Sequence, residues 1–250
     1  MIDVQEGPWF VGDLADKATL ERFAADVIAK SGRVDVLVNN AMPLFKGIDE
    51  CSYEEFAYAQ AVGVVAPFYL AKLFKDSFAE GASIINISSS RDRMSQPQSE
   101  SYTAAKGGIT ALTHALAASL AGRVRVNSIS PGWIDTSFKT YDGPDALQHF
   151  AGRVGNPMDI ANMVLYLASD KAGFITGENI CIDMHLRRSR QVPRRATRGA
   201  LQSKVARGCA RTPKGPQGAE RKHCFPTPYM LYMFYTAKII KKPRRFCRGR

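Results

Sequence analysis

Short apolar runs alternate along this chain with longer segments in which apolar residues recur every three or four positions. Val34 to Val38 and Ser83 to Ile87 are short and mostly apolar, as strands buried on both faces of a parallel sheet are. Val124 to Ser130 is predicted as a third buried strand, and Gly173 to Asp183 as a turn and a last strand. Strands that alternate with helical segments predict an α/β fold with a parallel sheet.

Helical periodicity marks the segments between these strands. One helix is expected before Val34, and three more over Phe56 to Phe78, Tyr102 to Leu120 and Ile160 to Ser169. Trp9 to Leu14 is predicted as a short strand, whereas the residues before it carry no clear pattern. The polar stretch 137–154 is expected to form a mobile lid.

Charge divides the chain at residue 184. The first 184 residues hold 15 Lys and Arg against 22 Asp and Glu, a net charge of −7. The remaining residues hold 19 Lys and Arg and one acid, Glu220, a net charge of +18. The sequence therefore predicts a folded domain over 1–183 and a basic, disordered tail over 184–250. Clustered basic residues would allow the tail to bind nucleic acid or an anionic membrane.

Cysteine spacing indicates neither a disulfide framework nor a metal site. Cys51 and Cys181 lie in predicted elements, and the tail cysteines have no CxxC spacing. The chain does not open with a charged and then apolar signal segment, and the longest apolar run of the tail, Tyr229 to Ala237, is shorter than the roughly 18 residues of a membrane span. We expect a cytoplasmic protein without a membrane span.

Candidate chemistry gathers between Asn86 and Lys106. Tyr102 and Lys106 are four residues apart, so on a helix they share one face, and a lysine cation would favour the phenolate of the tyrosine. Roughly 0.5 such pairs are expected by chance, and most are surface residues of helices. Ser89 adds context, because it lies at the end of a predicted strand, where its hydroxyl can bond a substrate oxygen that gains charge.

The spacing of Ser89, Tyr102 and Lys106 resembles that of the short-chain dehydrogenase/reductase family. The resemblance implies a Rossmann-like, doubly wound sheet and hydride transfer between NAD or NADP and a small alcohol or carbonyl substrate. Tyr102 would be the general acid/base, Ser89 would orient the substrate oxygen, and Lys106 would lower the pKa of Tyr102 and hold the ribose hydroxyls.

Further cofactor-binding residues follow from the same resemblance. Asn39-Asn40-Ala41 resembles the family's NNAG element, although an isolated Asn-Asn is more often only a turn. In the family, Asn39 would steady the sheet near the cofactor, with Ala41 beside it, and Asp13 would lie beside the adenine ring. The loop that begins at Pro131 and Gly132 resembles PGxxxT, which implies that the Ile134 backbone and the Thr136 hydroxyl bind the nicotinamide carboxamide.

Two positions depart from the family pattern. Met42 replaces a glycine, which is expected to crowd the approach to the cofactor. Gly63 replaces an asparagine that helps to hold a water beside the lysine, so a proton relay would need another route. Pro67, close by, predicts a kink or local break in the helix.

The match to the family pattern begins and stops abruptly along the chain. No GxGxxG or TGxxxGxG occurs in the 250 residues, and the strand ending at Asp13 corresponds to the third strand of the family fold. We therefore expect the first two strands and the glycine-rich loop to be missing, which would leave Val34 to Val38 as an unpaired edge and the strand at Phe10 without a neighbour. After Asp183 a glycine pair is expected, but Met184-His185 follows. A change of reading frame explains that break better than an evolved basic tail does.

Three hypotheses follow. The chain is an oxidoreductase of this family, an inactive fragment with an incomplete cofactor site, or, as the weakest of the three, a binder of nucleic acid or anionic membranes through its tail. The family also implies a homo-oligomer that pairs the helices Phe56 to Phe78 and Tyr102 to Leu120. Small residues on the second helix suit such contact, although core packing would select them too: Ala104, Gly108, Ala111 and Ala115.

Overall fold

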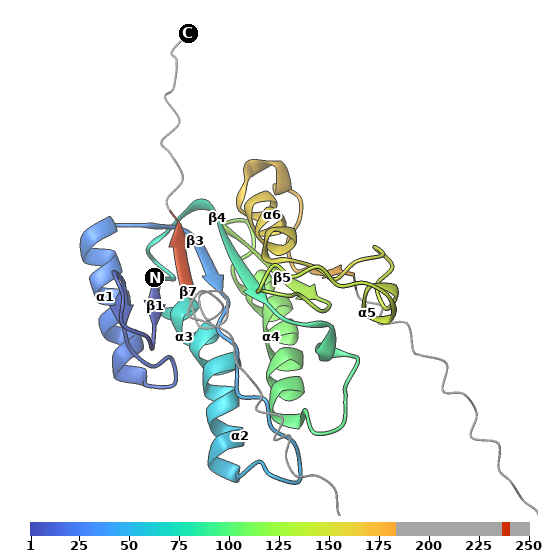
Figure 1. Ribbon diagram of the computed structural model, residues 1–250. Coiled ribbons are helices and arrows are strands. Elements are labelled where there is room, and N and C mark those ends of the chain that lie inside the picture. The colour runs from blue at the N-terminus through green and yellow to red at the C-terminus, as the bar shows by residue number, and fades with distance from the viewer. Residues whose placement is uncertain (184–236, 241–250) are drawn as a thin grey trace, which may run out of the picture.

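In a computed structural model of the protein, residues 1–183 and the strand Ala237–Ile240 are described (Figure 1). A seven-stranded sheet forms the centre, in the order β2-β1-β7-β3-β4-β5-β6. Four neighbouring strands are parallel, and they are β3 (Val34–Asn39), β4 (Phe78–Ile87), β5 (Val124–Pro131) and β6 (Asn179–Ile182). The expected α/β, Rossmann-like parallel sheet is therefore confirmed.

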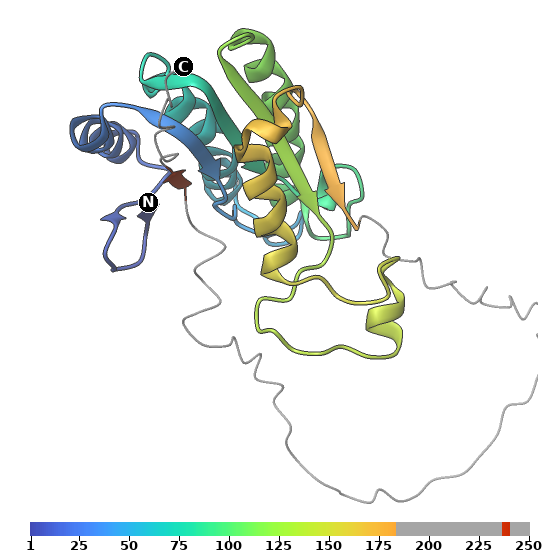
Figure 2. The same ribbon diagram turned by 90° about the horizontal axis from the view of Figure 1, so that it is seen from above.

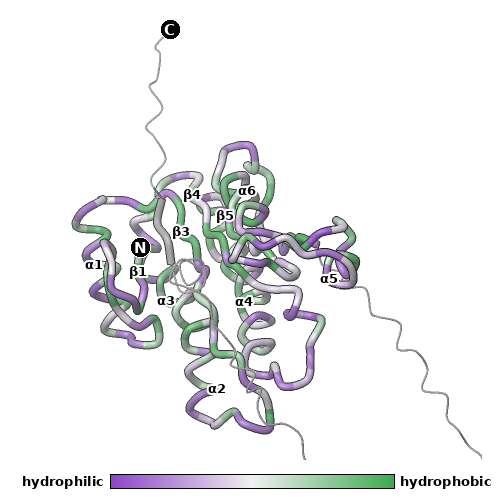
Figure 3. Tube along the Cα trace, viewed as in Figure 1, coloured by the Kyte–Doolittle hydropathy of each residue, from purple (hydrophilic) through white to green (hydrophobic). Residues whose placement is uncertain are grey.

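Helices cover both faces of this sheet (Figure 2). They are α1 (Lys17–Ser31), α2 (Tyr53–Gln60), α3 (Ala66–Leu73), α4 (Glu100–Ser119) and α6 (Pro157–Ala168), whereas the short α5 (Pro144–Leu147) lies away from the sheet. Residues of α1, α3 and α4 pack on one face around Leu37 and Ile84, and α6 packs on the other around Val38 and Ile85. Neighbouring strand residues point to opposite faces, so the continuous apolar runs serve two cores. Figure 3 shows the central strands as mostly hydrophobic and many of the connecting loops as hydrophilic.

The register of the parallel strands aligns their carboxyl ends. Asn39 of β3 lies opposite Asn86 of β4, which in turn lies opposite Ser128 of β5. The side chains agree with this alignment, because the Asn39 amide donates to the Asn86 side-chain oxygen at 2.8 Å. The segments that follow these strands therefore leave the sheet at one edge, where open α/β sheets bind ligands.

The predicted helix Phe56 to Phe78 is wrong at its end, because α3 stops at Leu73 and Phe78 begins β4. The irregularity expected near Pro67 is present as a local change of helix type. A five-residue π-helix, Ala61–Val65, joins α2 to α3 within one helical stretch, and Pro67 lies in the first turn of α3.

The expectation of an unpaired edge at Val34 to Val38 is also wrong. The strand β7 (Ala237–Ile240) pairs antiparallel with β3, so its backbone groups take up hydrogen bonds that β3 would otherwise leave open. Figure 1 shows β7 between β1 and β3. The remainder of the predicted tail lies outside the described residues, and the domain boundary after Asp183 stays a prediction.

The strand at Phe10 has a neighbour as well. A two-residue strand, β1 (Ile2–Asp3), runs parallel to β2 (Phe10–Val11) and antiparallel to β7. The sequence pattern missed β1 because two residues are too short to show periodicity.

One continuous helical stretch in the described residues, Tyr53–Leu73, is long and apolar enough to cross a membrane by length and composition alone. Core helices of proteins that never enter a membrane meet the same two criteria, and 39% of its most apolar window is buried inside the fold. The cytoplasmic location stays a prediction. Within residues 1–183, Cys51 and Cys181 are free thiols, and no three His, Cys, Asp or Glu side chains gather as metal ligands would.

Candidate active site

The end of β4 places Ser89 at the carboxyl edge of the sheet. After Ile87 the chain turns into a short 3₁₀ helix, Ser90–Asp92, and the Ser89 side chain caps it. Its Oγ accepts the backbone N–H of Arg91 at 3.2 Å. This bond occupies one acceptor position of the hydroxyl and leaves its own proton available for another partner.

The first turn of α4 is anchored to the loop after β3. The Ser101 hydroxyl lies 2.8 Å from the carbonyl oxygens of Leu44 and Lys46, and it accepts the Lys46 backbone N–H at 2.9 Å. These bonds set the position of the next residue, Tyr102. The predicted helical spacing is confirmed, because the Lys106 Nζ lies 5.5 Å from the centre of the Tyr102 ring.

Lys106 is buried, and its ammonium has a single hydrogen-bond acceptor in the described residues, the Ile87 carbonyl oxygen at 2.7 Å. Burial lowers the pKa of Lys106 to about 7, because the apolar surroundings disfavour the charged form. The lysine therefore carries a full charge only below neutral pH in the protein without ligands.

Tyr102 is subject to opposing influences. Burial raises the pKa of its hydroxyl, while a hydrogen bond from Ser89 and the positive charge of Arg91 both act to lower that pKa. The net direction is upward. Arg91, which the sequence did not single out, thus places positive charge near Tyr102.

A cavity of about 220 Å³ joins these groups to the loop after β5. Seven of the predicted site residues line it: Ser89, Tyr102, Lys106, Pro131, Gly132, Ile134 and Thr136. Gly132 is required by packing, since a Cβ there would lie 2.1 Å from the Asp183 carbonyl oxygen. The predicted PGxxxT loop and the Ser/Tyr/Lys group thus face one enclosed space.

The stretch 137–154 packs against Trp133, one of the residues that line this cavity. Trp133, which lines the cavity, lies between the rings of Tyr141 at 5.1 Å and His149 at 6.0 Å. His149 is buried, and its Nδ1 lies 2.7 Å from a carboxylate oxygen of Asp183 at the end of β6. The stretch is therefore tied to the sheet, and the mobility expected of it stays a prediction.

A second cavity of about 250 Å³ is lined by Asp13, Ala41 and Tyr58, among others. Met42 lines both cavities, so the residue that replaces the family's glycine forms part of the wall between them. The Tyr58 hydroxyl donates to the Asp13 carboxylate at 3.2 Å. Asn39 lines neither cavity and instead bonds Asn86, which supports its expected role in the sheet.

Gly63 has a steric explanation. It lies in the π-helix, and a Cβ there would be 2.7 Å from the Ala105 Cβ and 3.3 Å from the Pro43 Cβ. The close approach of this helix to α4 leaves no room for an amide side chain. The asparagine of the family pattern therefore requires a different packing of the two helices.

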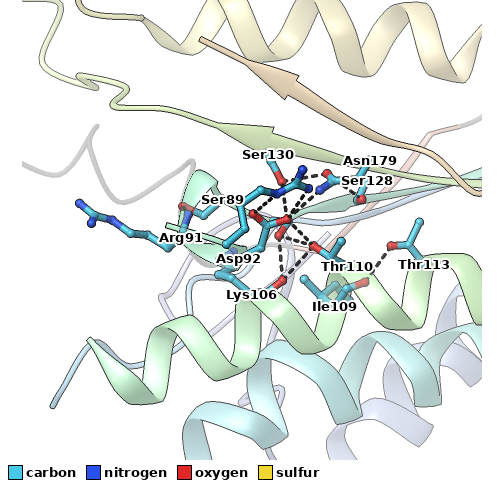
Figure 4. Close-up of polar contacts among 12 residues, drawn as sticks. Ser89, Arg91, Asp92, Lys106, Ile109, Thr110, Thr113, Ser128, Ser130 and Asn179 are labelled. Atoms are coloured by element: carbon cyan, nitrogen blue, oxygen red, sulfur yellow. Dashed lines mark hydrogen bonds and ion pairs between the residues drawn. The ribbon is translucent and has the colours of Figure 1, made fainter. Parts of the chain in front are cut away.

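Asp92, whose side chain is only 2% exposed, lies beside the site and was missed by sequence reasoning. Its carboxylate accepts hydrogen bonds from Asn179 at 2.7 Å and Thr110 at 3.2 Å, and it pairs with Arg93 at 3.0 Å. Figure 4 shows this group, the Asp92 cluster, joining the Ser89 turn to α4, β5 and β6. In the sequence, an acid between two arginines is typical of an exposed, charged surface. Only the fold shows that Asn179 and Thr110 lie against its carboxylate.

Comparisons with known proteins agree with this arrangement. A family model described as Enoyl-(Acyl carrier protein) reductase matches residues 2–184. An uncharacterized oxidoreductase of Thermotoga maritima is 43% identical over 185 residues, which cover 68% of this chain and 72% of the relative. D-threitol dehydrogenase of Mycolicibacterium smegmatis is 34% identical over 184 residues, 70% of this chain and 71% of the relative.

Solved structures are similar as well. An apo SCOR enzyme from Clostridium thermocellum superposes with a TM-score of 0.65 at 46% identity, covering 72% of this chain and 75% of the other. A blue fluorescent protein from a metagenomic library, in complex with NADPH, has a TM-score of 0.64 at 29% identity, covering 71% and 74%. The fold and the cavity define an NAD(P)-binding oxidoreductase class. The chain belongs to the short-chain dehydrogenase/reductase family.

Proposed function

We propose that the protein transfers a hydride between a nicotinamide cofactor and an alcohol or carbonyl carbon, with Tyr102 as general acid/base. One observation supports this most directly. The side chains of Ser89, Tyr102 and Lys106 line a single cavity together with the loop Pro131 to Thr136. A hydroxyl donor, a proton-transfer group and a cation beside one enclosed space suit a reaction in which charge develops on a substrate oxygen.

The residues present fit the nicotinamide end of the cofactor. Thr136 and Ile134 line the cavity opposite Lys106, and Lys106 is close enough to the carboxyl edge of the sheet to bond ribose hydroxyls. A nicotinamide bound there would supply or accept the hydride. NAD and NADP remain alternatives, because the sequence carries no glycine-rich motif for the adenosine end.

Each residue then has a distinct task in carbonyl reduction. Tyr102 donates its hydroxyl proton to the carbonyl oxygen as that oxygen gains negative charge. In the ligand-free protein Ser89 uses its single O–H to bond Tyr102, which favours the phenolate, and with substrate bound the same O–H donates to the carbonyl oxygen instead. Trp133 and Ile134 supply apolar wall to the site. Oxidation of an alcohol would use the same groups in reverse.

The test is turnover and binding by the purified full chain. Reaction with NAD⁺ and NADP⁺ is measured on threitol and cyclopentanol, since relatives are named as D-threitol and cyclopentanol dehydrogenases. Tyr102→Phe is expected to lower kcat by about 10²- to 10⁴-fold, the usual contribution of a general acid/base. Tyr166→Phe, which removes the hydroxyl of an exposed tyrosine on α6, is the matched control.

Full turnover by Tyr102→Phe would contradict the assignment of the acid/base. The alternative, a chain with the same ancestry but an incomplete cofactor site, has its own signature. No saturable binding of NAD(H) or NADP(H) at millimolar concentration, measured by calorimetry, would favour it.

A further inference from the structure

Arg91 lies next to the proposed reaction centre but has no part in the mechanism above. It is two residues after Ser89, in the 3₁₀ turn that Ser89 caps, and its backbone N–H donates to the Ser89 Oγ. Figure 4 shows its side chain extending away from the Asp92 cluster, on the far side of Ser89. Arg91 therefore points away from the Asp92 cluster, whereas Arg93 contacts it.

Arg93 has a carboxylate partner, whereas Arg91 has none in the described part of the chain. Arg93 makes two hydrogen bonds of 3.0 Å to the Asp92 carboxylate. The hydrogen bond found for the Arg91 guanidinium is a long one, 3.5 Å, to the Met94 carbonyl oxygen, and no ion pair in the described part of the chain includes Arg91. A guanidinium has five N–H donors in a fork that matches carboxylate and phosphate oxygens, so most of its donors are free to bind a ligand.

Arg91 is also partly withdrawn from water. Its side chain is half-buried, and burial lowers the pKa of the guanidinium although it stays charged at every ordinary pH. Burying a charge without a partner costs free energy, which an anionic ligand would recover. A fully exposed arginine stays hydrated, so its charge carries no such free-energy cost.

The charge acts on the reaction site itself. Arg91 interacts electrostatically with Tyr102, and both Tyr102 and Ser89 line the 220 Å³ cavity. Arg91 is not among the residues that line that cavity, but its backbone N–H bonds the Oγ of Ser89, which is. The cavity lining contains no Asp or Glu, although residues 1–184 as a whole carry a net charge of −7. The residues that line the cavity thus add no negative charge that would repel an anionic group.

We propose that Arg91 binds an anionic group of the substrate, a carboxylate or a phosphate, while the adjacent alcohol or carbonyl lies between Ser89 and Tyr102. The inference rests on the proposed function and names its substrate class, a small hydroxy or oxo compound that carries an acid. Ser89 and Arg91 come from one turn, so a single rigid element holds both the reacting oxygen and the charged end of the substrate.

Matched substrate pairs test the proposal. Acetoacetate is compared with methyl acetoacetate, and dihydroxyacetone phosphate with dihydroxyacetone, each with NADH and NADPH. The charged member of at least one pair is expected to have the higher kcat/KM, and the pair that shows this identifies carboxylate or phosphate. Arg91→Gln is expected to lower kcat/KM for that charged member by about 10- to 100-fold, as loss of a charge-assisted hydrogen bond does, and to leave the neutral member within about threefold.

Arg123→Gln is the control, since it removes the same charge from the turn before β5, at the opposite end of the strand from the cavity. Equal loss on charged and neutral substrates in Arg91→Gln, or a preference for the neutral member of both pairs, would overturn the proposal. Equal loss together with a shifted pH profile of kcat would show instead that Arg91 acts on Tyr102.

A binding measurement separates this proposal from the proposed function. Saturation-transfer NMR of acetoacetate and of dihydroxyacetone phosphate with the full chain needs no turnover. Binding that Arg91→Gln abolishes and Arg123→Gln retains would support the anion site even if every rate were zero. Turnover of neutral substrates without any Arg91-dependent binding of either anion would leave the proposed function intact and refute the anion site.

Discussion

At the residue scale, the fold changes the charge state that the sequence motif predicts for Lys106. The spacing of Tyr102 and Lys106 predicts that they meet on one helix face, and they do. The spacing does not predict that the lysine is buried against the Ile87 carbonyl, because burial depends on what packs over the helix. The sequence suggests that Lys106 is a permanent cation, but in the fold its pKa is about 7, so it is only partly charged at neutral pH.

Lys106 should leave a measurable mark on the pH dependence of stability. The unfolded chain binds the lysine proton up to its ordinary pKa near 10.5, whereas the folded protein releases it above about 7. The folded state thus binds fewer protons in this window, so the free energy of unfolding rises with pH from about 7 to 10. Replacing Lys106 by Met removes that slope.

The measurement is urea unfolding of the cofactor-free protein at pH 7 and pH 9. Between these two pH values, the free energy of unfolding of wild type should rise by about 2 kcal/mol more than that of Lys106→Met. Lys171→Met, on the exposed 3₁₀ turn after α6, is the control and should parallel wild type. A parallel response of Lys106→Met would mean that the buried lysine stays charged.

At the element scale, the π-helix between α2 and α3 is the least predictable part of the fold. Sequence periodicity continues through Ala61–Val65, and Pro67 predicts a break without giving its form. The five-residue π-helix brings Gly63 against Ala105 and Val64 against Gly108, and a Cβ added to either glycine would lie 2.7 Å from its neighbour. Two glycines, one on each helix, therefore allow the two helices to touch next to Lys106.

Substitution of Gly63 by Ala should destabilise the protein by about 1–3 kcal/mol, because the Ala105 Cβ is attached to a helix backbone and cannot rotate away. Gly107→Ala is the matched control on α4. The nearest atom to its added Cβ is 3.8 Å away, so the substitution should stabilise by about 0.5–1 kcal/mol through higher helix propensity. Thermal unfolding of the two variants measures the difference, and equal melting temperatures would refute the close contact.

At the scale of the whole molecule, one face of α4 is available for association. Ala104, Ala111 and Ala115 are exposed and lie on one side of the helix, whereas Gly108 is accounted for by its contact with Val64. The oligomer implied by the family resemblance therefore depends on three of the four small residues named from sequence. Small side chains permit close approach of two helices but do not by themselves cause it.

Ala111→Glu should shift the molar mass measured by light scattering after gel filtration from a dimer or larger oligomer to a monomer, since a carboxylate buried between two helices loses its hydration. Ala151→Glu adds the same charge to an exposed position in the lid stretch and should leave the mass unchanged. A monomeric wild type, or an Ala111→Glu variant with the mass of wild type, would contradict the prediction.

The sequence by itself determined the α/β class, because burial on two faces selects apolar runs that alternate with helical segments. It also predicted that Tyr102 and Lys106 meet, because a helix brings residues four apart together. The other predicted residues that line the cavity followed from the resemblance to the family. Only the tertiary structure decided what surrounds each group. The pairing of β3 with Ala237–Ile240, the burial of Asp92 and the exposed donors of Arg91 depend on contacts between segments far apart in sequence, which no local pattern encodes.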